Sequence, residues 1–125
     1  RDEYSETVGY KIYGKNKSIL YIPDIDKWSE WNHDIIEMIQ KHDFVIIDGT
    51  FFEDGEIPRP MREVPHPFIE ESVKIFSTLP LEQRNKIHFI HLNHSNPARD
   101  ENYPKRQEIE KMGFRFANFG LEFAL

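Results

Sequence analysis

The chain has 125 residues, of which 38% are hydrophobic and 14% aromatic, so it is long enough to bury the core of one domain. Its 16 basic and 22 acidic residues give a formal net charge of −6, which makes nucleic acid an unlikely partner and favours a small-molecule substrate. It contains no cysteine. This excludes disulfides and thiolate zinc sites, so any metal must bind to histidine and carboxylate side chains.

No hydrophobic run of the chain approaches the ~20 residues that a membrane-spanning helix requires. The chain opens on Arg1 and Asp2, and no signal segment follows them. We therefore expect no membrane partner and a cytoplasmic location. The periplasm stays open as an alternative, because the natural N-terminus is not seen.

The first part of the chain predicts a hairpin followed by a helix. Two β-type runs at residues 7–13 and 18–22 flank a turn-rich tetrapeptide, which is typical of an antiparallel pair. Hydrophobic residues at helical spacing then predict a helix that begins at Asp26 or Ser29 and ends near Lys41.

The middle of the chain predicts two buried strands around a long loop and a helix. Residues 44–47 form a short hydrophobic strand, and residues 49–65 are rich in glycine, proline and charge without periodicity. A helix with one apolar face is predicted from Pro67 to Pro80, and a strand at residues 86–92.

The last part of the chain predicts a helix that starts at Pro104 and is capped by Gly113. Two short strands are predicted after it, at residues 114–117 and 121–123. The complete order, ββαβαβαββ, predicts an α/β fold with a mixed sheet that is parallel in its middle and flanked by helices.

Polar side chains end three of the predicted core strands. Asp24, Asp48 and His91 each follow a hydrophobic run directly. Because ligands collect outside the carboxyl ends of the strands in open α/β sheets, these side chains predict a site at one edge of the sheet.

Each of the two carboxylates also has a purely structural interpretation. Asp24 lies where a strand ends and a helix approaches, so it could cap that helix instead of bridging metal ions. Asp48 could hold the following loop through hydrogen bonds from nearby backbone groups.

The histidines need the same comparison. His91 would share a strand face with Asn93, and a single strand histidine is usually a satisfied core residue. The adjacent Asn93 and His94 favour a ligand, because a ligand histidine needs partners that fix its tautomer. His88 points to the other face and is interpreted as structural. His66 precedes a predicted helix, where a surface turn is the alternative.

Four segments of the chain together resemble the C-terminal half of metallo-β-lactamase-fold proteins. They are Thr7-Val8-Gly9-Tyr10, Leu20-Tyr21-Ile22-Pro23-Asp24, Asp48-Gly49-Thr50-Phe51 and His91-Leu92-Asn93-His94-Ser95-Asn96-Pro97. The resemblance covers nearly the whole chain. Within the superfamily it is greatest to the pyrroloquinoline quinone biosynthesis protein B (PqqB) group, which also has an Asp-Gly-Thr-Phe turn and an Asn-Pro after the last histidine strand.

This resemblance implies half of an αββα sandwich and a centre of one or two divalent metal ions, usually zinc, with manganese or iron as alternatives. By position, Asp24 looks like the bridging carboxylate and His91 like the last histidine ligand. His66 is similar in place to a histidine that assists catalysis in phosphodiesterase members. The PqqB group tends to carry Asn at the position of His94 and to lack the bridging Asp. Both differences favour a metallohydrolase-like site.

The main metal-binding motif of the family, His-x-His-x-Asp-His, does not occur in these residues. We expect it, with a further histidine ligand, in an N-terminal half that precedes Arg1, so that residues 1–125 are the C-terminal half of the domain. Two ligands cannot complete the three- or four-ligand site that zinc requires. The 125 residues alone are therefore expected to be inactive.

The leading functional hypothesis is a hydrolase that uses metal-bound hydroxide on an ester or phosphodiester. Asp24 and His91 would bind metal, with Asp48 and Asn93 supporting them, and either His66 or His94 would donate a proton to the leaving group. One alternative is a PqqB-like enzyme that acts by oxidation. Another is a non-catalytic α/β module that binds a small ligand without metal.

Overall fold

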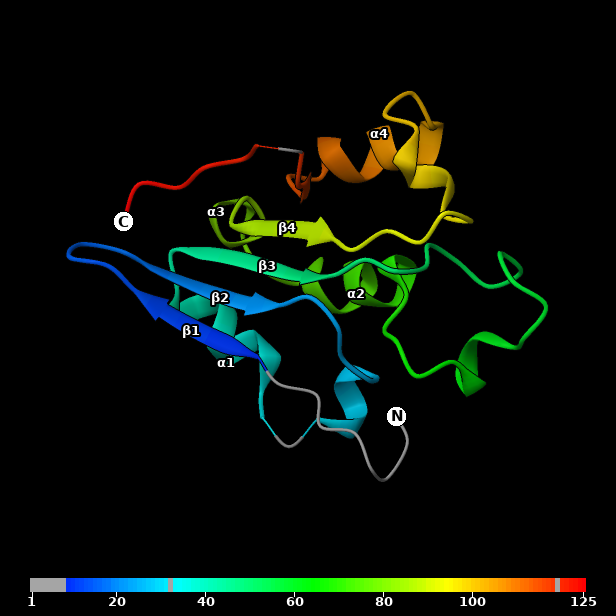
Figure 1. Cartoon of the computed structure of the whole chain (residues 1–125), viewed down its shortest axis with the longest axis horizontal. Coiled ribbons are helices and arrows are strands. Elements are labelled where there is room, and N and C mark those ends of the chain that lie inside the picture. The colour runs from blue at the N-terminus through cyan, green and yellow to red at the C-terminus, as the bar shows by residue number, and fades with distance from the viewer. Residues whose placement is uncertain (1–8, 32, 119) are drawn as a thin grey trace.

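The structure is a computed structural model that describes residues 9–31, 33–118 and 120–125. Thr7 and Val8, the first residues of the predicted hairpin, lie outside the described residues. The described strands form one five-stranded sheet with the order β1-β2-β3-β4-β5 (Figure 1). They are β1 (Tyr10–Tyr13), β2 (Ser18–Ile22), β3 (Phe44–Asp48), β4 (Ile87–Ile90) and β5 (Arg115–Phe116).

The pairing of the strands confirms the predicted mixed sheet. β1 pairs antiparallel with β2 as a hairpin. All the other neighbours in the sheet, from β2 to β5, are parallel. The carboxyl ends of β2, β3 and β4 therefore lie at the same edge of the sheet, as the proposed site requires.

Four α-helices accompany the sheet in the part of the chain that is described. They are α1 (Ile35–Lys41), α2 (Ile69–Phe76), α3 (Leu81–Arg84) and α4 (Pro104–Lys111). In Figure 1, α1 and α2 lie behind the sheet and α4 lies beyond β4. None of these helices is long and apolar enough to cross a membrane, a finding that applies to the described residues.

The core lies between the sheet and the helices behind it. Six side chains of β2, β3 and β4 on this face are at most 1% exposed, and the strand register places them side by side: Leu20, Ile22, Val45, Ile47, Ile87 and Phe89. The helices contribute three fully buried side chains to the same cluster: Ile39 of α1, and Ile69 and Phe76 of α2. Burial of these side chains from water is the main force that holds the helices on the sheet.

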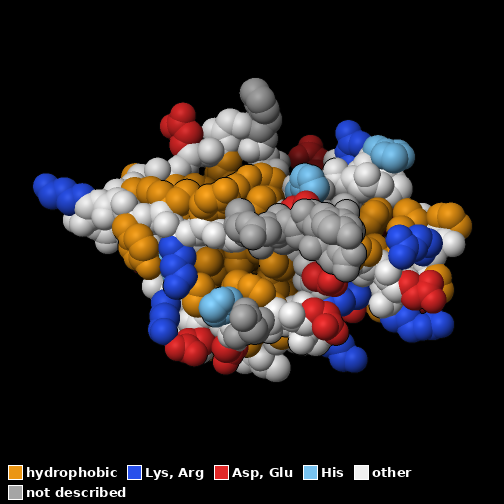
Figure 2. Space-filling model, turned by 60° about the horizontal axis from the view of Figure 1, so that its bottom comes forward, with side chains coloured by type: hydrophobic (Ala, Val, Ile, Leu, Met, Phe, Trp, Pro, Cys, Tyr) orange, Lys and Arg blue, Asp and Glu red, His pale blue; other side chains and the backbone are white. Residues whose placement is uncertain are grey.

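The other face of the sheet is also hydrophobic, but it is less covered. Tyr21, Phe44 and Ile46 are only half-buried there. The ring of Phe123 packs against Phe44, with 4.5 Å between the ring centroids. Figure 2 shows hydrophobic side chains gathered over the half of the molecule that carries the strands. Tyr10 and Ile12 of the edge strand β1 lie on this face and are 56% and 43% exposed.

The first predicted helix begins later than expected. A 3₁₀ turn occupies Trp28–Glu30, and α1 starts only after Asp34. The Oδ1 atom of Asp34 accepts hydrogen bonds from the backbone N–H groups of Ile36 (3.0 Å) and Glu37 (3.3 Å). Asp34 is therefore the cap of this helix, and the prediction that Asp26 or Ser29 starts it is wrong.

Two predicted strands also differ from the structure. The strand predicted at residues 86–92 ends at Ile90, because His91 has a φ of 67° and leaves the extended conformation. Residues 121–123 form no strand; Phe123 packs on the open sheet face instead. The predicted end of α4 is confirmed, since Gly113 follows it with a φ of 103°.

His88 makes the stability of the fold depend on pH. Burial lowers the pKa of His88 below its ordinary value, more than its hydrogen bond with the backbone oxygen of Lys86 raises it. The unfolded chain takes up this proton at higher pH, so His88 reduces stability as the pH falls below about 6.5. We expect His88→Gln to remove this part of the pH dependence in urea denaturation of the full-length protein. The exposed His33, changed to Gln, should leave the dependence as it is, and an unchanged slope in His88→Gln would contradict the assignment.

Candidate metal centre

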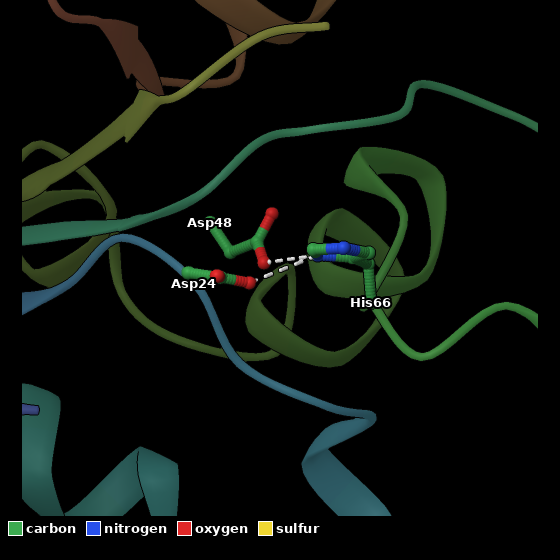
Figure 3. Close-up of side chains that lie close together, drawn as sticks. All are labelled: Asp24, Asp48 and His66. Carbon is green, nitrogen blue, oxygen red and sulfur yellow. Dashed lines mark hydrogen bonds and ion pairs between the residues drawn. The ribbon is translucent and has the colours of Figure 1, made fainter. Parts of the chain in front are cut away.

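Three side chains converge at the carboxyl edge of the sheet. Asp24 follows β2, Asp48 ends β3, and His66 comes from the loop before α2. Each offers one potential ligand atom, and these atoms all lie within 4.8 Å of one another. Figure 3 shows the imidazole of His66 pointing toward both carboxylates. Carboxylate and imidazole groups are a donor set that suits a divalent metal such as zinc.

Asp48 is completely buried and accepts four hydrogen bonds. Its Oδ1 accepts from the backbone N–H of Thr50 (2.8 Å) and from the Thr50 hydroxyl (2.7 Å). Its Oδ2 accepts from the backbone N–H of Ile25 (3.0 Å) and from Nδ1 of His66 (2.7 Å). A carboxylate has about four acceptor positions, and all of them are used here. Asp48 therefore holds its neighbours, and a metal could bind to it only by displacing one of these donors.

This environment agrees with the prediction that Asp48 is buried and accepts hydrogen bonds from nearby donors. The purely structural interpretation is also correct, because Asp48 holds the following loop through Thr50. The same buried carboxylate makes all of these contacts, and it must be paired to be stable away from water.

Position 49 of the Asp-Gly-Thr sequence has little room for a side chain. A Cβ atom on Gly49 would lie 3.0 Å from the Cβ of Phe89 and 3.1 Å from the carbonyl oxygen of Ile90. The backbone N–H of Gly49 donates to that same oxygen at 2.8 Å. Glycine therefore allows the loop after β3 to approach the end of β4 closely.

The segment that carries Asp24 is attached to α2. Lys27 forms an ion pair with Glu71, with 2.6 Å between Nζ and Oε1. The indole N–H of Trp28 donates to the hydroxyl of Ser72 at 2.9 Å. These contacts hold the segment after β2 against the helix that follows His66, which keeps the two parts of the site together.

Asp24 faces His66 and does not cap a helix. Its Oδ1 lies 3.5 Å from Nδ1 of His66, and its side chain is 45% exposed. The cap of α1 is provided by Asp34, so the capping interpretation of Asp24 is wrong. The Oδ1 atom itself is buried, although the side chain as a whole is partly exposed.

His66 has a defined hydrogen-bond direction. Because both oxygens of Asp48 accept from backbone N–H groups, the carboxylate is the acceptor and Nδ1 of His66 is the donor. The imidazole makes a T-shaped contact with the ring of Phe51, with 5.6 Å between centroids. The Nε2 atom is then the nitrogen that can act as a base or a ligand.

His91 is joined to this cluster through Thr50. It is exposed, and its Nδ1 lies 3.2 Å from the Thr50 hydroxyl. The expectation that Phe89, His91 and Asn93 share one strand face is wrong, because the positive φ of His91 ends the strand alternation. Binding of one ion by Asp24 and His91 together stays a prediction.

Asn93 and His94 lie on the loop after β4. The side chain of Asn93 donates to the hydroxyl of Ser95 (2.7 Å), which in turn donates to Oε2 of Glu56 (2.6 Å). Asn93 thus attaches this loop to the long loop after β3. His94 is exposed, and the cluster of Asp24, Asp48 and His66 does not include it.

Three contributors to the site were not assigned from the sequence: Thr50, Glu56 and Ser95. Thr50 stood in the Asp-Gly-Thr-Phe motif, where a hydroxyl two residues after a buried carboxylate is a signal for such a contact. Glu56 lies in a loop without periodicity and meets Ser95 across 39 residues. Local spacing carries no signal for that contact.

Comparison with protein families assigns the fold. The beta-lactamase superfamily domain model matches residues 1–92, which is most of the chain. The chain belongs to the metallo-β-lactamase superfamily.

Two similar proteins carry the same name. It is 30% identical to coenzyme PQQ synthesis protein B of Gluconobacter oxydans, over 96% of this chain and 40% of that protein. It is 27% identical to the protein of the same name from Cupriavidus taiwanensis, over 96% of this chain and 41% of that protein. The chain thus spans about 40% of the length of these relatives.

A solved structure supports the same relationship. The crystal structure of Zn²⁺-bound PqqB from Methylobacterium extorquens matches with a TM-score of 0.72 and 25% identity. The match covers 95% of this chain and 44% of that protein. The mixed sheet with its helices is therefore the metallo-β-lactamase arrangement that the sequence predicted.

We predict that Asp48→Asn destabilises the full-length protein by about 3 kcal/mol in urea denaturation, because an amide nitrogen must then face buried N–H donors. Asp43→Asn is the matched control. Asp43 is exposed and accepts from the backbone N–H of Ser18 at 2.9 Å, a contact that an amide oxygen can keep. Equal effects of the two substitutions would contradict the role of Asp48.

Proposed function

We propose that this chain contributes to the active site of a divalent-metal hydrolase that cleaves an ester or a phosphodiester. The observation that carries the proposal is the convergence of Asp24, Asp48 and His66 at the carboxyl edge of the sheet, to which His91 is joined through the hydroxyl of Thr50. A carboxylate on a partly exposed side chain, beside an oriented imidazole, suits metal-assisted hydrolysis.

Asp24 and His91 are the residues that would hold the metal. Zinc suits this donor set best, and manganese or iron is the alternative. A bound ion would lower the pKa of its water to about 7 and polarise the scissile bond. The other ligands would come from an N-terminal half of the domain. The length of the relatives, of which this chain spans about 40%, supports that arrangement.

His66 is the proposed proton donor to the leaving group. Its Nδ1–H donates to Asp48, which orients the ring, and in the doubly protonated imidazolium form Nε2 carries the proton that would go to the leaving group. His94 is the second candidate for this role, because it is exposed on the loop that follows His91. The contacts of His66 with Asp24 and Asp48 favour His66 over His94 as the proton donor.

The similarity to coenzyme PQQ synthesis protein B supports a second candidate function, a step in the synthesis of a quinone cofactor. It extends over 96% of the chain. This candidate would involve oxidation, so a redox-active iron in the purified protein would favour it. Zinc alone would not separate it from hydrolysis, because the matching PqqB structure is itself Zn²⁺-bound. A protein without bound metal would favour the third candidate, a non-catalytic module that binds a small ligand.

The hydrolase proposal predicts cleavage of bis(p-nitrophenyl) phosphate or a p-nitrophenyl ester by the full-length protein loaded with zinc or manganese. His66→Ala should reduce kcat by about 10²- to 10⁴-fold with unchanged metal content, because a proton donor is lost while the ligands remain. Steady-state kinetics and metal analysis of the same samples measure both quantities. A metal-loaded protein that cleaves neither substrate class would contradict hydrolysis.

The ligand assignment predicts that Asp24→Ala and His91→Ala weaken zinc binding by the full-length protein more than about 100-fold, which exceeds the loss expected for an outer-shell partner. His33→Ala, a change outside the cluster, is the control and should bind zinc normally. Calorimetric titration measures the affinities. The 125 residues alone should bind zinc weakly, since two ligands leave most coordination positions to water. Tight stoichiometric binding by this chain alone would refute the division of ligands between two halves.

A further inference from the structure

We propose that Thr50 is a positioning residue that fixes the tautomer of His91, so that the Nε2 of this histidine carries the lone pair. The hydrogen bonds that carry this inference do not depend on any metal. Its importance for metal binding rests on the proposed function, in which His91 is a ligand.

The hydroxyl of Thr50 can donate in only one direction. Thr50 is buried, and its Oγ1 lies 2.7 Å from Oδ1 of Asp48 and 3.2 Å from Nδ1 of His91. A hydroxyl has one proton and two acceptor lone pairs, whereas the carboxylate here is an acceptor. The Thr50 proton therefore goes to Asp48, and the Thr50 oxygen must accept from His91.

His91 is then protonated at Nδ1. In the neutral imidazole one nitrogen is a donor and the other an acceptor, so Nε2 carries the lone pair that a metal requires. His66 is also held in the Nδ1-protonated tautomer, in this case by Asp48 itself, because its Nδ1 donates to Oδ2 of Asp48. Asp48 thus fixes one histidine by direct contact and the other through the Thr50 hydroxyl.

The backbone contacts of Thr50 allow the hydroxyl to be tested separately. The backbone oxygen of Thr50 accepts from the N–H of Asn93 at 2.9 Å and from Nδ2 of Asn96 at 3.2 Å. Its backbone N–H donates to Asp48. The loop with His91 therefore stays attached when the hydroxyl is removed, and Thr50→Val deletes only the link to the imidazole and one donor to Asp48.

The first test is the tautomer of each histidine in the metal-free, full-length protein at alkaline pH, read from ¹H–¹⁵N correlation spectra of the imidazole rings. His91→Ala and His66→Ala assign the two sets of signals. We expect both histidines to be protonated at Nδ1 in the unchanged protein. An Nε2-protonated His91 would overturn the inference before any variant of Thr50 is made.

The second test compares Thr50→Val with Thr50→Ser in the same spectra. We expect His91 to shift toward the Nε2-protonated form in Thr50→Val and to keep its tautomer in Thr50→Ser, which retains a hydroxyl. His66 should keep Nδ1 protonation in both variants, which shows that the site is folded. A His91 tautomer that is unchanged in Thr50→Val, or lost in Thr50→Ser, would refute the role of Thr50.

Zinc affinity then separates this inference from the proposed function. We expect Thr50→Val to bind zinc about 10- to 100-fold more weakly than Thr50→Ser, as for other partners of a ligand histidine. A shifted tautomer with unchanged zinc affinity would support the positioning by Thr50 and would remove His91 from the ligand set. An unchanged tautomer would refute the positioning whatever the zinc affinity.

Discussion

The buried carboxylate of Asp48 is the interaction on which the candidate site depends. It lies at the end of β3 with no exposed surface and accepts from the segment after β2, from Thr50 and from His66. A buried carboxylate without partners would be strongly destabilising, so these three segments must stay in place for the charge to be tolerated. Each element of the site is thus positioned by the same requirement.

The two faces of the sheet show how this chain fits its superfamily. One face is covered by α1 and α2, and six of its strand side chains are at most 1% exposed, whereas Tyr21, Phe44 and Ile46 on the other face are only half-buried. Sheets with parallel strands are usually covered on both faces. The open face therefore suits the packing of a second layer, and Phe123 already covers one part of it.

The sequence predicted those parts of the fold that depend on residues close together in the chain. Short hydrophobic runs located the strands, and the strand ends placed Asp24 and Asp48 at the same edge. The pairing of Asp48 with His66 joins residues 18 positions apart across a loop without periodicity, so only the folded chain reveals it. The positive φ of His91 follows a hydrophobic run that continues without a turn signal, so no pattern in the strand itself predicts it.

The shared carboxylate also determines how this edge of the sheet moves. The amide protons of Ile25 and Thr50 both point to Asp48, so opening either segment leaves the same buried charge short of a donor. Local opening of one loop therefore favours opening of the others, and the two amides should exchange with solvent as one cooperative unit. The site would then be present as a whole or absent as a whole, with little population of partly assembled forms.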